Sequence, residues 1–117
     1  MSIIILLAFF LVWQVLFPAR FWLNIIKNVD LSDPAATGEW LVQKYDCQKC
    51  HRIAGEGALK GPDLMGVTEK LSDTEIRRWL GNPGSVERGT AMPDFRLSDS
   101  EITAIIAYLR RLDAERP

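Results

Sequence analysis

Both cysteines and the only histidine of this 117-residue chain lie within five consecutive positions, Cys47-Gln48-Lys49-Cys50-His51. A Cys-x-x-Cys-His run is the attachment motif of a c-type haem. The two cysteine sulfurs can each form a thioether bond to the porphyrin, and the imidazole of His51 can bind the iron from one side. A covalent haem also gives a small domain a large apolar plate on which helices can pack, so the motif constrains the fold as well as the chemistry.

Two other uses of the same residues fit the sequence less well. A structural zinc site needs four ligands in a tetrahedron, and beyond Cys47 and Cys50 the chain offers only His51, which follows Cys50 too closely. A thioredoxin-like dithiol would follow a strand in a βαβ unit, whereas the residues before Cys47 have a helical pattern. A chance cluster is the remaining alternative, and we expect one covalent haem c.

The N-terminal segment is strongly apolar. Residues 3–17 carry only one polar side chain, but at ~1.5 Å per residue they span about 22 Å, which is less than the roughly 30 Å of a hydrocarbon layer. Extension of the helix to Ile26 gives about 36 Å, which is enough to cross if the Arg20 side chain snorkels to the interface. The sequence therefore predicts one transmembrane anchor helix over residues 1–27, bent at Pro18.

Two alternatives to an anchor remain. A cleaved signal peptide would place basic residues before the apolar run and a small-residue cleavage site after it, but no Lys or Arg precedes Arg20 and no Ala-x-Ala follows the run. A buried core helix would need other apolar elements large enough to cover it. No other stretch of the chain is as apolar.

The remainder of the chain is predicted to be a small helical domain. Residues 28–33 form a short linker, and Pro34 suits the first turn of a helix that Asp33 or Ser32 would cap and that would run into the haem motif. Five residues between positions 53 and 66 are glycine or proline, which indicates a loop. The haem domain is expected to occupy residues 34–117.

Two capping boxes predict two further helices. Ser72 and Glu75 begin a helix over about residues 73–80, which Gly81 ends. Ser98 and Glu101 precede an apolar face at helical spacing, formed by Ile102, Ile105, Ile106, Leu109 and Leu112. No alternating strand pattern of useful length is present, so the expected fold class is all-α.

The presence of a second axial ligand from the protein distinguishes an electron carrier from a haem protein that binds gas or peroxide. In electron-carrying c-type haems this ligand is usually a methionine. Met92 lies in an irregular segment between two predicted helices, where the chain can reach the far side of the porphyrin, and Pro93 stiffens that segment. Met65, after the glycine-rich loop, is a weaker candidate that could simply be packing. An open distal site is the third possibility.

The motifs together resemble a class I, mono-haem cytochrome c. The resemblance covers nearly all of residues 33–112 and rests on the order Gly38, Cys47-x-x-Cys50-His51, Gly61-Pro62-x-Leu64, Trp79-Leu80-x-Asn82-Pro83, Met92-Pro93-x-Phe95, Leu97-Ser98-Asp99-x-Glu101-Ile102 and Tyr108-Leu109. It implies one N-terminal transmembrane helix followed by a small helical domain wrapped around covalent haem.

The resemblance also implies roles for individual residues. The backbone carbonyl of Pro62 would accept the Nδ1 proton of His51, which orients a ligating imidazole. Trp79 would reach a haem propionate with its indole N–H, and Leu64 and Phe95 would shield the haem from water. Gly38 and Tyr108 would form the close crossing of the first and last helices of the domain, although Trp79 and Tyr108 could equally be ordinary core.

An iron bound by both His51 and Met92 has no free position for a substrate, so we expect a one-electron carrier and not an enzyme. The linker is too short for the domain to swing far, which favours a subunit of a respiratory or photosynthetic membrane complex with redox-protein partners. A tethered shuttle, a haem protein with a labile distal site for gas or peroxide, and a haem-free zinc-stabilised adaptor are the alternatives. The formal net charge of −1 and the absence of a basic stripe argue against a nucleic-acid partner.

The expected location is the bacterial cytoplasmic (inner) membrane, crossed once, with the haem domain on the periplasmic side. Arg20 and Lys27 follow the span and by the positive-inside rule would pull the domain into the cytoplasm. Haem attachment to Cys-x-x-Cys-His normally takes place on the outer side, and we give this requirement the greater weight.

Overall fold

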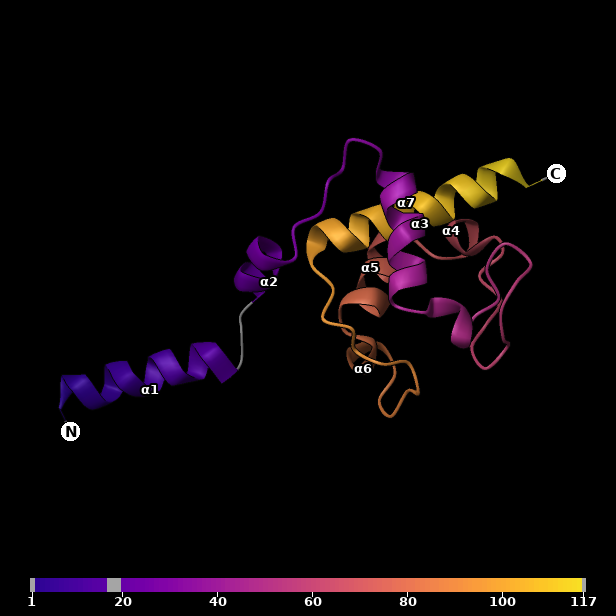
Figure 1. The fold of residues 1–117 in the computed structure, drawn as a ribbon. Helices are drawn as coiled ribbons and strands as arrows, with labels where there is room; N and C mark the ends of the chain where they lie inside the picture. The colour runs from indigo at the N-terminus through magenta and orange to yellow at the C-terminus, as the bar shows by residue number, and fades with distance from the viewer. Residues whose placement is uncertain (1, 17–19, 117) are drawn as a thin grey trace.

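The structure is a computed structural model that describes residues 2–16 and 20–116. Figure 1 shows its elements in chain order: α1 (Ile3–Leu16), α2 (Arg20–Ile26), α3 (Pro34–Lys44), the 3-10 turn η1 (Cys47–Lys49), α4 (Val67–Lys70), α5 (Asp73–Gly81), α6 (Pro83–Val86) and α7 (Asp99–Glu115). Within these residues the only β-type pairing is an isolated bridge between Ile53 and Glu56. The all-α prediction is confirmed.

Helices α3 and α7 form the centre of the domain and cross closely (Figure 1). At the crossing, a Cβ atom on Gly38 would lie 2.8 Å from the Cβ of Tyr108, so only glycine lets the two helices approach this far. These helices contribute most of the buried apolar residues, and loops and α5 supply the rest. The core consists of Leu41, Val42, Ile53, Ile76, Leu97, Ile102, Ala104, Ile105, Ile106, Tyr108 and Leu109.

The predicted helix starts are confirmed. Asp33 caps α3 by accepting the backbone N–H of Ala36, and both α5 and α7 begin with complete capping boxes. Helix α3 ends at Lys44 and does not continue into the haem motif, because Asp46 adopts a left-handed conformation with φ of 55° that breaks the helix. The helices α4 and α6 were not predicted, since four residues are too few to show a periodic pattern.

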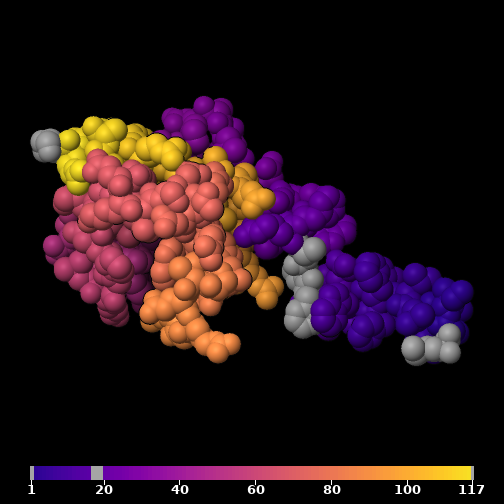
Figure 2. Space-filling view, turned by 180° about the vertical axis from the view of Figure 1, so that it is seen from behind, coloured from indigo at the N-terminus to yellow at the C-terminus, as the bar shows by residue number. Residues whose placement is uncertain are grey.

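The predicted anchor consists of two helices in the structure. No single helix among the described residues is long and apolar enough to cross a membrane, whereas α1 and α2, taken together as a bent pair, have the required length and composition. The predicted bend at Pro18 lies outside the described residues. Helix α1 buries none of its side chains, and Figure 2 shows it as an indigo rod that projects from the rest of the molecule.

Helix α2 lies against the start of α7. The Arg20 guanidinium donates to the carbonyl oxygen of Leu97 at 2.8 Å and lies 3.2 Å from a carboxylate oxygen of Asp99. The amide of Asn24 both donates to the Asp99 carboxylate and accepts the Asp99 backbone N–H, each at 2.8 Å. Arg20 therefore binds the helical domain, whereas the sequence analysis expected its side chain to snorkel to the membrane interface.

Candidate functional site

The Cys-x-x-Cys-His motif forms one tight turn. The backbone N–H groups of Cys50 and His51 both donate to the carbonyl oxygen of Cys47, at 3.3 and 3.0 Å. Cys47 and Cys50 form no disulfide with each other, and each is half-buried. Burial, reinforced by the nearby charge of Asp46, raises the pKa of the Cys47 thiol to about 11.

The His51 ring is fixed by one hydrogen bond. Its Nδ1 lies 2.8 Å from the carbonyl oxygen of Pro62. Because a carbonyl oxygen can only accept, Nδ1 carries the proton, and in the neutral ring Nε2 is then the nitrogen with the lone pair. This is the contact that the resemblance implied, and it leaves the outer ring nitrogen available as a ligand.

Gly61 makes room for that ring. A Cβ atom on Gly61 would lie 2.6 Å from Cε1 and 2.9 Å from Nδ1 of His51, which is closer than real Cβ atoms come to other atoms. The Gly61 N–H donates to the Cys50 carbonyl at 2.7 Å, and the Leu64 N–H donates to the Arg52 carbonyl at 3.0 Å. These bonds hold the glycine-rich loop against the motif, so that Gly61 and Pro62 contact the His51 ring.

Asp113 fixes the other end of this loop, and the sequence analysis missed it. Its carboxylate, on α7, accepts the backbone N–H groups of Gly66 and Thr68 at 2.8 and 3.0 Å and also the Thr68 hydroxyl. Burial alone would raise the pKa of Asp113, but these hydrogen bonds and the nearby charge of Arg116 keep it below its usual value. The position of Asp113 in the sequence could have indicated its burial, because it follows Leu109 by four residues and so lies on the buried face of the predicted helix.

Met92 lies in the irregular segment between α6 and α7, as predicted, and is half-buried; its backbone N–H donates to the Thr90 hydroxyl at 3.3 Å. The other methionine candidate, Met65, is 52% exposed. Phe95 packs on the apolar core and its ring centre lies 5.5 Å from that of Tyr45.

The remaining predicted residues lie on separate elements. Leu64 packs against the same core as Phe95, and Trp79 is a half-buried residue of α5. The structure thus brings His51, Pro62 and Gly61 into direct contact, with Cys47 and Cys50 on the same turn. Within residues 2–16 and 20–116, no cluster of three or more His, Cys, Asp or Glu side chains has an arrangement that could hold a metal ion.

Two features of this site fit a covalently attached haem. The two thiols and the histidine come from one turn, so a porphyrin bonded to both sulfurs lies beside the imidazole. The Pro62 contact leaves Nε2 of His51, and not Nδ1, with the lone pair that an iron needs.

Comparison with known proteins agrees with this geometry. The sequence model of the family described as Cytochrome c matches residues 35–113. The chain is 27% identical to a nitric oxide reductase subunit of Halomonas halodenitrificans, over 92% of this chain and 79% of the relative. It is 30% identical to cytochrome c oxidase subunit 2 of Bacillus subtilis (strain 168), over 80% of this chain and 32% of the relative.

A third relative is the corresponding nitric oxide reductase subunit of Cereibacter sphaeroides, which is 29% identical over 71% of this chain and 63% of the relative. The chain therefore spans less than two thirds of the second and third of these proteins. All three relatives are, by name, subunits of larger proteins.

Proposed function

Because this chain belongs to the cytochrome c family and so carries a covalent haem c, we propose that it is a membrane-anchored one-electron carrier with His51 and Met92 as the axial iron ligands. Cys47 and Cys50 hold the porphyrin through thioether bonds. When bound, the haem supplies reversible one-electron exchange at its iron, and a methionine ligand favours the reduced form. No catalytic residue is needed for this role.

The proximal side is supported by the hydrogen bond between His51 and Pro62, the single observation that carries the proposal. It fixes the tautomer in which Nε2 is the metal-binding atom, and it holds the plane of the ring. The absence of a side chain at Gly61 keeps the ring in this orientation without a clash. In the folded domain, this contact orients the His51 ring for coordination.

The proposed iron ligand on the distal side is Met92. It is half-buried in an irregular segment, whereas Met65 is mostly exposed. With both axial positions filled by protein, a substrate cannot reach the metal, and this distinguishes a carrier from a peroxidase or gas-binding protein. Leu64 and Phe95, which pack on the core, would limit the access of water to the haem. The role proposed for Trp79 is to donate its indole N–H to a propionate.

The anchor is supported by the exposure of apolar side chains. Every apolar side chain of α1 is largely exposed, and α2 exposes a second apolar stripe made of Phe21, Trp22, Ile25 and Ile26. Since α1 alone is too short to cross the bilayer, we propose that the exposed stripe of α2 completes the crossing on the side of the helical domain, which Arg20 and Asn24 bind. Residues 1–27 then form the anchor, 28–33 the linker and 34–117 the haem domain.

The relatives guide the choice of partners. They are named as parts of nitric oxide reductase and of cytochrome c oxidase, which favours a respiratory complex over a photosynthetic one. We propose that this chain is the electron-transfer subunit of such a complex in a bacterial inner membrane, with its haem domain on the periplasmic side. A redox-protein donor, an acceptor subunit and the lipid bilayer are its partners.

Absorption spectroscopy on the full-length protein purified in mild detergent tests this function. We expect a pyridine haemochrome spectrum of a c-type haem, and a weak far-red sulfur-to-iron band in the oxidised protein that disappears in Met92→Ala but persists in Met65→Ala. A wild-type protein that lacks the far-red band and binds carbon monoxide rapidly at neutral pH would instead support the labile distal site.

A further inference from the structure

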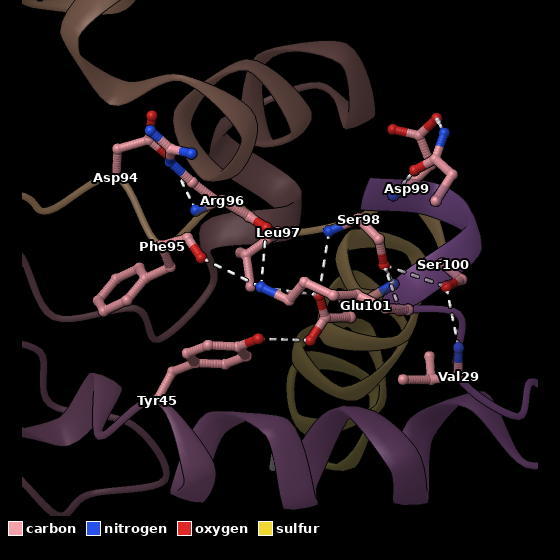
Figure 3. A network of polar contacts seen from close by, with 12 residues as sticks. Val29, Tyr45, Asp94, Phe95, Arg96, Leu97, Ser98, Asp99, Ser100 and Glu101 are labelled. Atoms are coloured by element: carbon pink, nitrogen blue, oxygen red, sulfur yellow. Dashed lines mark hydrogen bonds and ion pairs between the residues drawn. The ribbon is translucent and has the colours of Figure 1, made fainter. Parts of the chain in front are cut away.

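The first residue after α2, Lys27, reaches into the haem domain. Its ammonium group donates to the carbonyl oxygens of Arg96 at 2.8 Å and Phe95 at 3.3 Å, and lies 3.5 Å from a carboxylate oxygen of Glu101. Figure 3 shows Phe95, Arg96, Ser98 and Glu101 gathered around this network of polar contacts. One side chain from the anchor region thus binds two consecutive carbonyl groups close after Met92.

Glu101 is a fixed partner for this ammonium group. Only 1% of its surface is exposed, and its two carboxylate oxygens already accept the backbone N–H of Ser98 at 3.0 Å and the hydroxyl of Tyr45 at 2.6 Å. Burial of an ionised carboxylate costs free energy of folding unless a group of opposite charge lies beside it, and Lys27 supplies that charge for Glu101.

The backbone around Lys27 is fixed as well. The Ser98 hydroxyl donates to the Lys27 carbonyl at 2.7 Å, and the Val29 N–H donates to the Ser100 hydroxyl at 3.1 Å. These two bonds place the backbone of the lysine, so its side chain reaches Phe95 and Arg96 from a defined position.

The turn that Lys27 binds is strained. Arg96 has a φ of 52°, in the left-handed region that residues other than glycine rarely adopt. Its own N–H is satisfied by the carboxylate of Asp94 at 2.9 Å, and its carbonyl oxygen by Lys27. Because the Lys27 ammonium group donates to the carbonyl oxygens of both Phe95 and Arg96, it stabilises this unfavourable backbone conformation.

The segment that carries Met92 has no comparable support elsewhere. Among the described residues, the hydrogen bonds of residues 87–94 are all local. The Glu87 N–H donates to Pro83, the Thr90 N–H to Glu87 and the Met92 N–H to the Thr90 hydroxyl, and the Asp94 carboxylate accepts the N–H of Arg96. The first long-range hydrogen bonds after Met92 are those that Lys27 makes with Phe95 and Arg96.

We propose that Lys27 is a positioning residue for the distal ligand, which couples the anchor segment to the loop that carries Met92. By fixing the C-terminal end of this loop, Lys27 reduces how often the Met92 sulfur leaves the iron. The inference rests on the proposed ligation by His51 and Met92, and it adds a residue outside the region that matches the family.

The test compares three variants in the full-length, haem-loaded protein in detergent. Lys27→Met keeps the length of the side chain but removes its charge and donors, and Lys27→Arg restores both. Arg111→Met is the matched control, because Arg111 makes a 2.8 Å ion pair with Glu39 between α7 and α3 and does not contact the Met92 loop. The readouts are the far-red band during alkaline titration, the rate of carbon monoxide binding to the reduced protein, and stability in denaturant.

We expect Lys27→Met to bind carbon monoxide about tenfold faster than wild type, in line with the loss of hydrogen bonds from a charged donor, and to lose the far-red band at a lower pH. Lys27→Arg should behave like the wild type, and Arg111→Met should change stability alone. The inference is overturned if Lys27→Met matches wild type in both ligand readouts, or if Arg111→Met changes them equally. A wild-type protein without a far-red band would refute the methionine ligation and this inference together, so the two failures are distinguishable.

Discussion

Gly38 of α3 lies directly against the backbone of Ala104 in α7, so closely that a Cβ atom on Gly38 would overlap the Ala104 carbonyl oxygen. The contact joins the helix that leads into the haem motif to the helix that follows the Met92 loop. This crossing is therefore one of the contacts that connect the two segments bearing the proposed axial ligands.

The first prediction concerns that crossing. Gly38→Ala should lower the free energy of unfolding by about 1–3 kcal/mol, because the helices must separate to accept the methyl group. The measurement is chemical denaturation followed by the haem absorption. Gly84→Ala in α6 is the control, since its nearest neighbour would lie 3.9 Å away and its stability should be close to wild type. Equal stability of Gly38→Ala and wild type would contradict the close crossing.

The second prediction concerns the contact of Gly61 with the His51 ring. Gly61→Ala should push the His51 ring away from the Pro62 carbonyl, because the added Cβ would come within 2.6 Å of Cε1. We expect a smaller low-spin fraction in the absorption spectrum of the oxidised protein. Gly84→Ala again serves as the control and should leave this spectrum unchanged. An unaltered low-spin spectrum in Gly61→Ala would show that the ring has space to move.

The third prediction concerns pH and Asp113. The pKa of this carboxyl is lower in the folded protein than in the unfolded chain, so its contribution to stability is complete above the unfolded pKa of about 4 and is lost as the pH falls through the folded pKa. Asp113→Asn should cost about 1–2 kcal/mol at neutral pH and progressively less below about pH 4. Denaturation of both proteins between pH 7 and pH 3 measures this difference. A gap that stays constant over this range would contradict the assignment.

The fourth prediction concerns the left-handed residue Arg96. Asparagine tolerates a positive φ better than β-branched residues do, so Arg96→Val should be less stable than Arg96→Asn by about 1 kcal/mol or more. Both variants remove the same exposed side chain, so the pair isolates the backbone effect. If denaturation gives the two variants the same stability, the strain at residue 96 does not exist in solution.

The fifth prediction concerns the dependence of the fold on haem. The double variant Cys47→Ala/Cys50→Ala cannot form thioether bonds, and the small core should then be insufficient to keep the tertiary structure. We expect its thermal unfolding, followed by near-ultraviolet circular dichroism, to show no cooperative transition. A sharp transition in the haem-free variant would show that the helices alone fold the domain.

Local signals in the sequence predicted the helices well. The capping boxes that begin at Ser72 and Ser98 each pair residues only three positions apart, so both helix starts were visible without knowledge of the fold. The haem motif and its turn are local in the same sense. The contact between His51 and Pro62 followed from the resemblance and not from spacing, because it joins residues eleven positions apart.

The contacts that the sequence did not reveal are long-range. Arg20, Asn24 and Lys27 bind residues that lie 77, 75 and 69 positions later, and no pattern within either segment indicates the pairing. The apolar composition of the N-terminal segment instead predicted one continuous membrane helix. Asp113 was missed for a related reason, since a carboxylate on a helix is usually solvated, and its partners Gly66 and Thr68 come from a distant loop.

The bonds from Arg20, Asn24 and Lys27 to residues 96–99 attach α2 directly to the haem domain. A carrier on a long tether samples partners by swinging above the surface, whereas the anchored arrangement proposed above would keep one face of the haem domain turned toward the lipid headgroups. Encounters with a partner then depend on lateral diffusion in two dimensions. The rate of electron delivery should respond to protein density in the bilayer more than to the viscosity of the surrounding medium.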